Sequence, residues 1–402
     1  MTKQEWIDMG DNCLMSNYKR YPVVLTRGLG VHLWDSEGRC YLDLVAGIAV
    51  CALGHAHPRV VAALKEQAEN LFHVSNLYHI APQILLARLL VENSPFDKVF
   101  FCNSGAEANE ALIKLARKWG NPQGKSELIC MEDSFHGRTL ATLAATGRAK
   151  YRKGFEPDMP GFVHVPFNDL DAIAKAITPK TAAVIVEPVQ GEGGVLPSAD
   201  GFLQGLRKLC DEKGILLLFD EVQCGMGRTG HLFAWQSYGV QPDALSIAKA
   251  FGNGIPIGGI IASRKYADVL TPGTHASTFG GTPLACAAAC AVIDTMLNDG
   301  VLGNCKRQSA FLMAELNKLK AKHKAIVEVR GRGLLVGVVL THSAIPLLPL
   351  LRKHGLIALV AGETVLRLLP PLTVTEAQCK QAARIIAKAL SEYEAVAGAQ
   401  KA

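Results

Sequence analysis

Residues 215–223 have the sequence ILLLFDEVQ, in which five apolar residues are followed directly by two carboxylates. An apolar run without alternation is typical of a strand that is covered on both faces. Similar short runs occur at four other places in the chain: residues 98–102, 128–131, 183–186 and 244–248. Helical patterns lie between them, for example at 106–119 and 200–213. This alternation predicts an α/β domain with a mostly parallel sheet, spanning about residues 50–295.

The two ends of the chain have a different pattern. Residues 14–42 suggest a hairpin-like segment with a strand at 30–35. Beyond residue 300, the pattern predicts a helix at 305–323, a strand at 333–340 and an amphipathic helix at 375–392. We therefore expect residues 1–49 and 296–402 to form together a second, smaller α+β domain.

The composition is that of a folded protein with a large core. Of the 402 residues, 49% are hydrophobic and 19% are charged, and the charged share is below the usual ~25%. These values exclude a disordered chain. The net charge of +6 is spread thinly along the sequence, so we expect no binding to nucleic acid.

The cysteines and the apolar runs indicate the cellular compartment in which the protein works. There are eleven cysteines, an odd number, and they form no C-x-x-C motif. The first residues contain no apolar signal core. The longest apolar run, at 284–293, is shorter than the ~20 residues that span a bilayer. We expect a cytoplasmic protein in a reducing environment, with no membrane contact.

Ligands bind beyond the carboxyl ends of the strands in an open α/β sheet, so the residues that follow each strand are candidates for a site. After the strand at 98–102, Ser104 and Glu107 have the spacing of a capping box, which marks the start of a helix. The free N–H groups of that helix and the small residues Gly105 and Ala106 would let a phosphate approach closely. An ordinary capped helix is the simpler explanation of this motif alone.

Three other strands end in residues with useful chemistry. Phe135 and Arg138 follow one strand and could stack on a flat ligand and bind a carboxylate. Asp220 ends a second and could pair with a protonated ring nitrogen. Lys249 follows a third, where partial desolvation would make its amine nucleophilic. Taken singly, each also fits a packed turn, a helix cap or a solvated lysine. Together with the phosphate cradle, they are the groups needed to hold pyridoxal phosphate (PLP).

Five motifs in the chain resemble those of the class III (ω-amino acid) aminotransferases. They stand in matching order and spacing at residues 104–110, 135–138, 187–194, 220–223 and 242–249. The resemblance covers nearly the whole chain. It implies a fold-type I PLP-dependent transferase and a homodimer whose active sites lie at the subunit interface.

The resemblance also implies roles for the residues that would bind the cofactor. Lys249 would be the catalytic lysine that bonds to PLP and shuttles a proton, and Asp220 would keep the pyridine nitrogen protonated. Val222 and Phe135 would pack on opposite faces of the ring, and Gln223 would approach its hydroxyl. The phosphate would lie against Ser104, Gly105 and Ala106. Thr278 would reach the phosphate of the other subunit.

Other matching positions concern the substrates. Arg138 would bind the α-carboxylate of N-acetylornithine, with Ser277 nearby. Arg367 matches the arginine that binds the α-carboxylate of 2-oxoglutarate, and Glu192 matches the glutamate that shields this arginine while the amine donor is bound. Tyr18 matches a tyrosine at the substrate end. No metal ligand is implied.

The implied reaction transfers the δ-amino group of N-acetylornithine to 2-oxoglutarate, a step of arginine biosynthesis. Ile48 stands where ornithine δ-aminotransferases carry a tyrosine, and an apolar side chain suits an acylated amine. N-succinylornithine, N-succinyl-diaminopimelate, ornithine and 4-aminobutyrate stay open as alternative donors. One departure from the pattern is Phe251-Gly252-Asn253-Gly254, close to Lys249, where relatives tend to have leucine and further glycines.

Three other classes of function compete with this interpretation. Residues 225–230 fit the G-x-G-x-x-G pattern of dinucleotide-binding dehydrogenases, but no helix start follows and no acidic residue stands ~20 residues further on. A metal site could use His55 and His57 or Cys286 and Cys290, although neither pair has a completing set of four ligands. A PLP-dependent aminomutase would share the fold.

Overall fold

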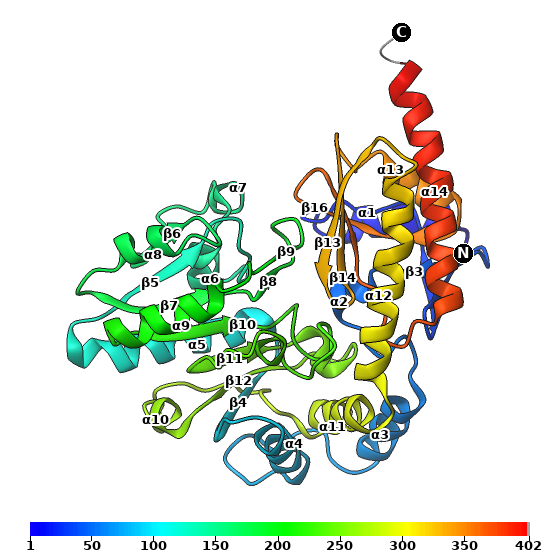
Figure 1. Ribbon diagram of the computed structural model, residues 1–402. Helices are drawn as coiled ribbons and strands as arrows, with labels where there is room; N and C mark the ends of the chain where they lie inside the picture. Colours follow the sequence, from blue (N-terminus) through cyan, green and yellow to red (C-terminus); the bar gives the residue numbers. More distant parts are fainter. Residues whose placement is uncertain (400–402) are drawn as a thin grey trace.

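The computed structural model describes residues 1–399, and a seven-stranded sheet forms its left-hand part in Figure 1. The strand order is β4-β12-β11-β10-β7-β5-β6. The strands are β4 (Lys98–Cys102), β5 (Glu127–Met131), β6 (Phe162–Val165), β7 (Thr181–Val186), β10 (Leu216–Asp220), β11 (Ala244–Ile247) and β12 (Gly258–Ala262). Only β12 is antiparallel to its neighbours. The prediction of a mostly parallel sheet is confirmed, and the five predicted strands agree with the observed ones to within two residues.

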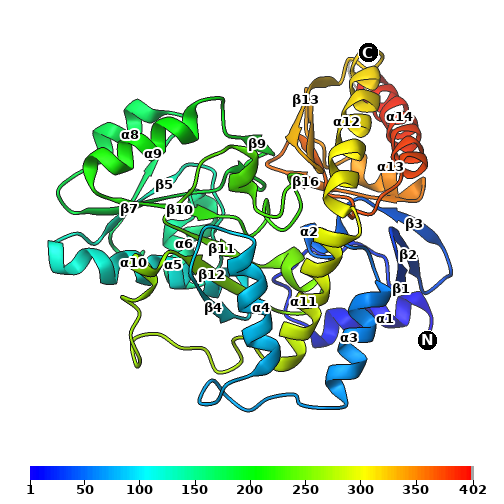
Figure 2. The same ribbon diagram turned by 60° about the horizontal axis from the view of Figure 1, so that its bottom comes forward.

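The apolar side chains of β10 pack alternately on the two faces of this sheet. Leu217 and Phe219 belong to the core that includes Leu203 and Leu206 of α9 (Phe202–Lys213). Leu216 and Leu218 belong to a second core, which α5 (Gly105–Gly120) shares. Figure 2 shows α9 with α8 (Leu170–Ala176) on one side of the sheet and α5 on the other. Because both faces are covered, the strand needs no polar residue until Asp220.

A second sheet, formed late in the chain, has the order β13-β14-β17-β16 and is antiparallel throughout. Its strands are β13 (Ile326–Arg332), β14 (Leu335–Leu340), β17 (Val365–Leu368) and β16 (Leu359–Ala361). The helices α12 (Val301–Lys320), α13 (Leu347–Lys353) and α14 (Glu376–Ala399) pack beside it. We call this the C-terminal sheet. The two helices and the strand predicted in this region are confirmed.

The two ends of the chain meet in a third sheet. Its order is β1-β2-β3-β15, made of β1 (Leu25–Leu29), β2 (His32–Asp35), β3 (Cys40–Asp43) and β15 (Leu356–Ile357). Leu42 of β3 pairs with Leu356 in parallel. This pairing joins segments that are more than 300 residues apart in the sequence. Nothing in the local pattern of residues 40–43 predicts such a partner.

The other elements connect these three sheets. They are α1 (Lys3–Cys13), α2 (Ala46–Ala49), α3 (Pro58–Ala68), α4 (Ala81–Glu92), η1 (Asn121–Gln123), α6 (Leu140–Ala145), α7 (Ala149–Arg152), β8 (Val189–Gln190), β9 (Leu196–Pro197), η2 (Ala234–Ser237), η3 (Lys249–Gly252), α10 (Arg264–Ala267) and α11 (Pro283–Asn298). Within residues 1–399, no single helix is long and apolar enough to cross a membrane; only α11 and α12 together pass by length and composition, and they are bent by 66°.

Candidate active site

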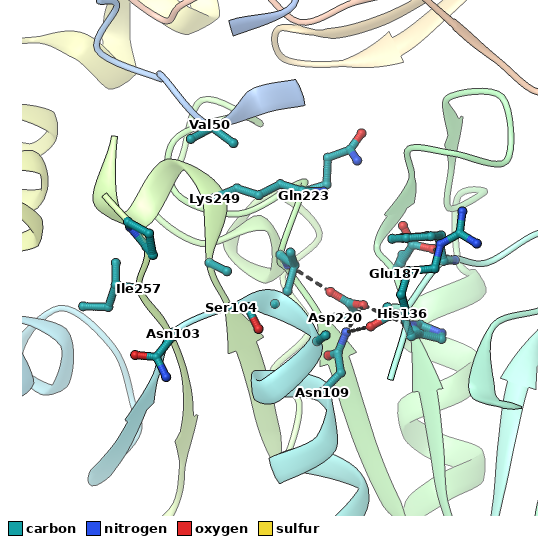
Figure 3. A pocket seen from close by; sticks show the side chains of 18 of the residues that line it. Val50, Asn103, Ser104, Asn109, His136, Glu187, Asp220, Gln223, Lys249 and Ile257 are labelled. Atoms are coloured by element: carbon teal, nitrogen blue, oxygen red, sulfur yellow. Dashed lines mark hydrogen bonds and ion pairs between the residues drawn. The ribbon is translucent and has the colours of Figure 1, made fainter. Parts of the chain in front are cut away.

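A cavity of about 430 Å³ lies at the carboxyl ends of β4, β5, β10 and β11. The topology of the sheet puts these four ends together, which is why the strand-end residues meet. Nine of the predicted site residues line the cavity: Ser104, Gly105, Ala106, Phe135, Arg138, Asp220, Val222, Gln223 and Lys249. Figure 3 shows Lys249 and Gln223 above Asp220, which is grouped with His136 and Asn109.

The N-terminus of α5 opens into this cavity. Ser104 caps the helix, and its hydroxyl accepts a hydrogen bond from the backbone N–H of Glu107 at 3.2 Å. In the described part of the chain, the N–H groups of Gly105 and Ala106 have no acceptor. A Cβ atom on residue 105 would lie only 2.6 Å from Cγ1 of Val222, so only glycine fits between the helix and that side chain. The helix end is therefore a compact cradle for an anion.

Asp220 lies at the inner end of the cavity and is 2% exposed. Its Oδ2 atom accepts a hydrogen bond from Asn109 at 2.7 Å and lies 2.7 Å from Nδ1 of His136. Its Oδ1 atom accepts from the backbone N–H of Val222 at 3.0 Å. Burial alone lowers the pKa of His136, but the hydrogen bond and the charge of Asp220 outweigh it and raise that pKa. Asp220 is thus a buried carboxyl group held by an imidazole, a side-chain amide and a backbone N–H.

A second buried carboxyl group, Glu187, was not predicted from the sequence. It accepts hydrogen bonds from the backbone N–H groups of Phe135 at 2.9 Å and Gly191 at 3.3 Å. Burial, and then the negative charge of Asp220, raise the pKa of Glu187 to about 7. Glu187 therefore fixes the backbone beside the aromatic ring without needing a full negative charge.

Lys249 follows β11 and begins the short turn η3. Burial lowers the pKa of its amine, and the nearby charge of Arg367 acts in the same direction, while Glu192 opposes it. At the end of the turn, Asn253 accepts a hydrogen bond from the N–H of Leu53 at 2.8 Å and donates one to the carbonyl of Gly54 at 3.1 Å. This residue of the segment that departs from the family pattern thus fastens the lysine-bearing turn to the chain at 53–54.

Phe135 and Arg138 lie at the opening of the cavity. The guanidinium of Arg138 lies 3.9 Å from the ring centroid of Tyr151 and 5.5 Å from that of Phe135. The two rings meet edge to face at 6.0 Å. Arg138 is exposed, so it can leave this stack for a carboxylate. Tyr151, which stacks on it, was not predicted because it lies in α7, away from any strand end.

Glu192 and Arg367 form an ion pair next to the cavity, as predicted. Nη1 of Arg367 donates to Oε1 of Glu192 at 2.6 Å and to Oε1 of Gln223 at 3.1 Å. Arg367 is 2% exposed. Burial alone would raise the pKa of Glu192, but the charge and hydrogen bond of Arg367 lower it. A carboxylate can reach this guanidinium only after Glu192 has moved aside.

Three predicted residues lie away from the cavity. Ser277 is one contact removed, since its hydroxyl accepts a hydrogen bond at 3.1 Å from Asn103, a lining residue. Thr278 is exposed, and Tyr18 is 69% exposed; neither lines the cavity of this chain.

The glycine-rich loop and the His and Cys pairs that suggested a dinucleotide or metal site have structural roles instead. The loop at 225–230 is buried and leads to the turn η2, not to an α-helix. His55 pairs with Asp43 at 2.7 Å, and Cys286 is buried in α11. Among residues 1–399, no group of three or more His, Cys, Asp or Glu side chains could hold a metal ion.

Comparisons with known proteins show the family to which the chain belongs. Residues 14–390 match the model of the family described as aminotransferase class-III. The chain is 53% identical to the acetylornithine aminotransferase of Myxococcus xanthus over 90% of this chain and 92% of that protein. Among solved structures, it is similar to an ornithine aminotransferase from Toxoplasma gondii that has PLP at partial occupancy in its active site. The TM-score is 0.95 and the identity 33%, with 98% of this chain and 95% of that chain covered. The acetylornithine aminotransferase from Elizabethkingia anophelis has a TM-score of 0.88 and 34% identity, with 98% and 100% covered.

Proposed function

Because the chain belongs to the class III aminotransferases, we propose that it transfers the δ-amino group of N-acetylornithine to 2-oxoglutarate, giving N-acetylglutamate 5-semialdehyde and glutamate. The observation that carries this function is the meeting of Lys249, Asp220 and the N-terminus of α5 in one cavity. The reaction is a step of arginine biosynthesis.

The cavity fits PLP, the cofactor of this family. The free N–H groups at Gly105 and Ala106 suit its phosphate, and a Cβ atom at residue 105 would obstruct that cradle. Asp220 suits its pyridine nitrogen, and Phe135 and Val222 suit its ring faces. When bound, PLP supplies an electron sink for negative charge at the carbon that carries the amine.

The residues of the chain supply the proton transfers and the fixed charges. Burial lowers the pKa of the Lys249 amine, so its Nζ atom can accept a proton. It would take this proton from the δ-carbon of the donor and deliver it to the C4′ position of the cofactor. Asp220, held by His136 and Asn109, keeps a negative charge at the inner end of the cavity. Gln223, which also lines the cavity, would approach the cofactor hydroxyl.

Two carboxylate-binding positions would separate the substrates. Arg138 binds the α-carboxylate of the donor at the opening of the cavity, and Ser277 is proposed to assist it. Arg367 binds the α-carboxylate of 2-oxoglutarate, and Glu192 covers it while the donor reacts. The two substrates differ at this position, because the donor carries an acylated amine and the keto acid carries a second carboxylate. The Glu192–Arg367 ion pair, if it opens only for a carboxylate, therefore distinguishes them.

The assembly is proposed to be a homodimer with active sites at the subunit interface. Its support is a group of exposed apolar side chains beside Thr278: Phe72, Leu77, Tyr78 and Phe279 are 60–85% exposed. Asn76 joins this group by donating to the carbonyl of Gly280 at 2.9 Å. A second copy that covers these residues would bring Thr278 to the phosphate of the partner's cofactor and would place Tyr18 at the substrate end.

A cytoplasmic location and the division into residues 1–49, 50–295 and 296–402 also belong to this proposal. All eleven cysteines are free in the structure, which suits a reducing compartment. The pairing of β3 with β15 supports a unit built from both chain ends.

A screen of the first half-reaction tests the function. N-acetylornithine, N-succinylornithine, N-succinyl-diaminopimelate, ornithine and 4-aminobutyrate are each added without keto acid, and the absorbance of the lysine-bound cofactor is followed. We expect the fastest loss of absorbance with N-acetylornithine. If it leaves the absorbance unchanged while another amine removes it, the proposed donor is wrong. Lys249→Ala should abolish transfer, and a rate near the parent's would refute the role of Lys249.

A further inference from the structure

Three residues form a row across the C-terminal sheet. In the register of β13, β14 and β17, Arg330 is opposite Gly337, and Gly337 is opposite Arg367. Directly opposed residues point to the same face of a sheet, so both arginines lie on one face, two strands or about 10 Å apart. The glycine between them leaves that face open in the middle of the row.

The loop between β8 and β9 crosses this row. At one end, Glu192 is bound to Arg367. In the middle, Val195 fills the open position, because a Cβ atom on residue 337 would lie 2.9 Å from its Cβ atom. At the other end, Arg330 donates from Nη2 to the carbonyl of Gly194 at 2.8 Å and from Nε to that of Val195 at 3.1 Å. Figure 1 shows β9 beside β13, where these contacts are made.

The backbone of this loop is held in an unfavourable conformation. Val195 has a φ of +54°, which a β-branched residue rarely adopts, and it is fully buried. Gly194 has a φ of +113°. Such conformations persist where surrounding contacts fix them. Two arginines of the C-terminal sheet bind this loop. Arg367 binds the Glu192 side chain, and Arg330 binds the backbone carbonyls of Gly194 and Val195.

We propose that Arg330 is a positioning residue for substrate discrimination. By holding the carbonyls of Gly194 and Val195, it keeps Glu192 within reach of Arg367. Without these bonds the loop gains conformational freedom, and the closed Glu192–Arg367 pair is populated less. Arg367 is then open to carboxylates for more of the time. The inference rests on the proposed function, since it concerns how one site treats its two substrates.

Arg332 offers a matched control on the same strand and face. It donates from Nε to the hydroxyl of Ser237 at 2.9 Å, and its guanidinium lies 3.9 Å from the ring centroid of Tyr238. Like Arg330, it ties β13 to a segment of the chain outside the C-terminal sheet. Its hydrogen bonds go to Ser237 and not to the loop that carries Glu192.

The test compares PLP-loaded Arg330→Gln and Arg332→Gln in two measurements. The first is the dissociation constant of glutarate, a five-carbon dicarboxylate without a keto group, by titration calorimetry. The second is the ratio of first-half-reaction rates with glutamate and with N-acetylornithine. For Arg330→Gln we expect about threefold to tenfold tighter glutarate binding and a similar shift of the ratio toward glutamate, a change within the range for losing the hydrogen bonds to Gly194 and Val195. Arg332→Gln should change neither by more than about twofold.

The side chain of Arg330 is partly exposed, so the Gln variant should fold, and thermal unfolding verifies this. Arg330→Lys keeps a charged donor and should give smaller shifts in the same direction; it carries the comparison if the Gln variant does not fold. Equal shifts in both Gln variants would mean a general loosening and would overturn the proposal. So would parent-like values for the Arg330 variants. If the parent enzyme does not react with N-acetylornithine, the proposed function fails, while glutarate binding still decides the role of Arg330.

Discussion

The Nδ1 atom of His136 lies 2.7 Å from Oδ2 of Asp220, and both buried side chains line the cavity. With Glu187 close by, this region holds two carboxyl groups and one imidazole. The imidazole of His136 and the side-chain amide of Asn109 both lie within hydrogen-bond distance of the same oxygen of Asp220. The carboxylate that would meet the cofactor nitrogen is therefore fixed from behind by two residues from different elements.

Replacing His136 by glutamine should lower kcat/KM for both substrates by about tenfold to a hundredfold, the effect typical of losing a supporting partner behind a functional group. The reason is that Asp220 loses its contact with the imidazole while Asn109 still holds it in place. Steady-state kinetics with each substrate measure the loss. His164→Gln is the control, because His164 is partly buried but does not line the cavity. Rates near the parent's in His136→Gln would show that Asp220 does not depend on this pair.

Gly105→Ala should weaken cofactor binding by about tenfold, because the new methyl group meets Val222 at 2.6 Å and forces a shift at the helix end that faces the phosphate. Titration of the cofactor-free protein with PLP, followed by absorbance, gives the dissociation constant. Gly10→Ala serves as the comparison, since a Cβ atom there has no neighbour within 4 Å. Unchanged affinity in Gly105→Ala would place the phosphate elsewhere.

Asn253→Ala should destabilise the protein by about 2 kcal/mol, since it removes the hydrogen bonds to Leu53 and Gly54 and leaves alanine at a φ of +46°. Asn253→Gly removes the bonds but relieves the backbone, so its loss should be smaller. Urea unfolding measures both. Asn317→Ala, an exposed change on α12, provides the reference. An alanine variant as stable as the parent would mean that these bonds do not hold the lysine-bearing turn.

His55 predicts a pH dependence of stability. Its hydrogen bond to Asp43 raises the pKa of His55 to about 9 from an ordinary 6.5. Because the folded protein binds the proton more tightly than the unfolded chain, the stabilisation is complete below pH 6.5 and is lost as the pH rises toward 9. The loss should be on the order of 2 kcal/mol.

Unfolding free energies measured at pH 6 and pH 9 detect this loss. The difference between the two should shrink in His55→Gln and persist in His342→Gln, which changes an exposed histidine. The same pH difference in His55→Gln as in the parent would assign the effect to other groups.

Much of the site could be predicted because its residues follow directly after recognisable strands. Ser104, Asp220 and Lys249 each stand at the end of an apolar run, and the parallel order of the strands brings them together. His136, Glu187 and Asn109 were missed because their function depends on contacts across the sheet. Asn109 did leave a signal: it is a polar residue on the buried face of α5, three residues before Leu112.

The parts of the fold that were not predicted depend on distant partners. β12 begins with Gly258 and Gly259, which are poor strand formers, yet any Cβ atom on them would collide with the backbone of residues 100 and 104. Glycine is required there by the neighbouring strand, and no local pattern shows this. Thr278 and Tyr18 do not line the cavity of their own chain, so the roles proposed for them require a second copy.

The pairing of β3 with β15 also has a consequence during synthesis of the chain. Residues 40–43 leave the ribosome early, but their parallel partner at 356–357 follows roughly 300 residues later. At a synthesis rate of about 5–20 residues per second, one edge of β3 has no partner for about 15–60 seconds. An unpaired strand edge invites pairing with other chains. Slower translation should therefore increase aggregation of the nascent protein, even though the stability of the finished enzyme is unchanged.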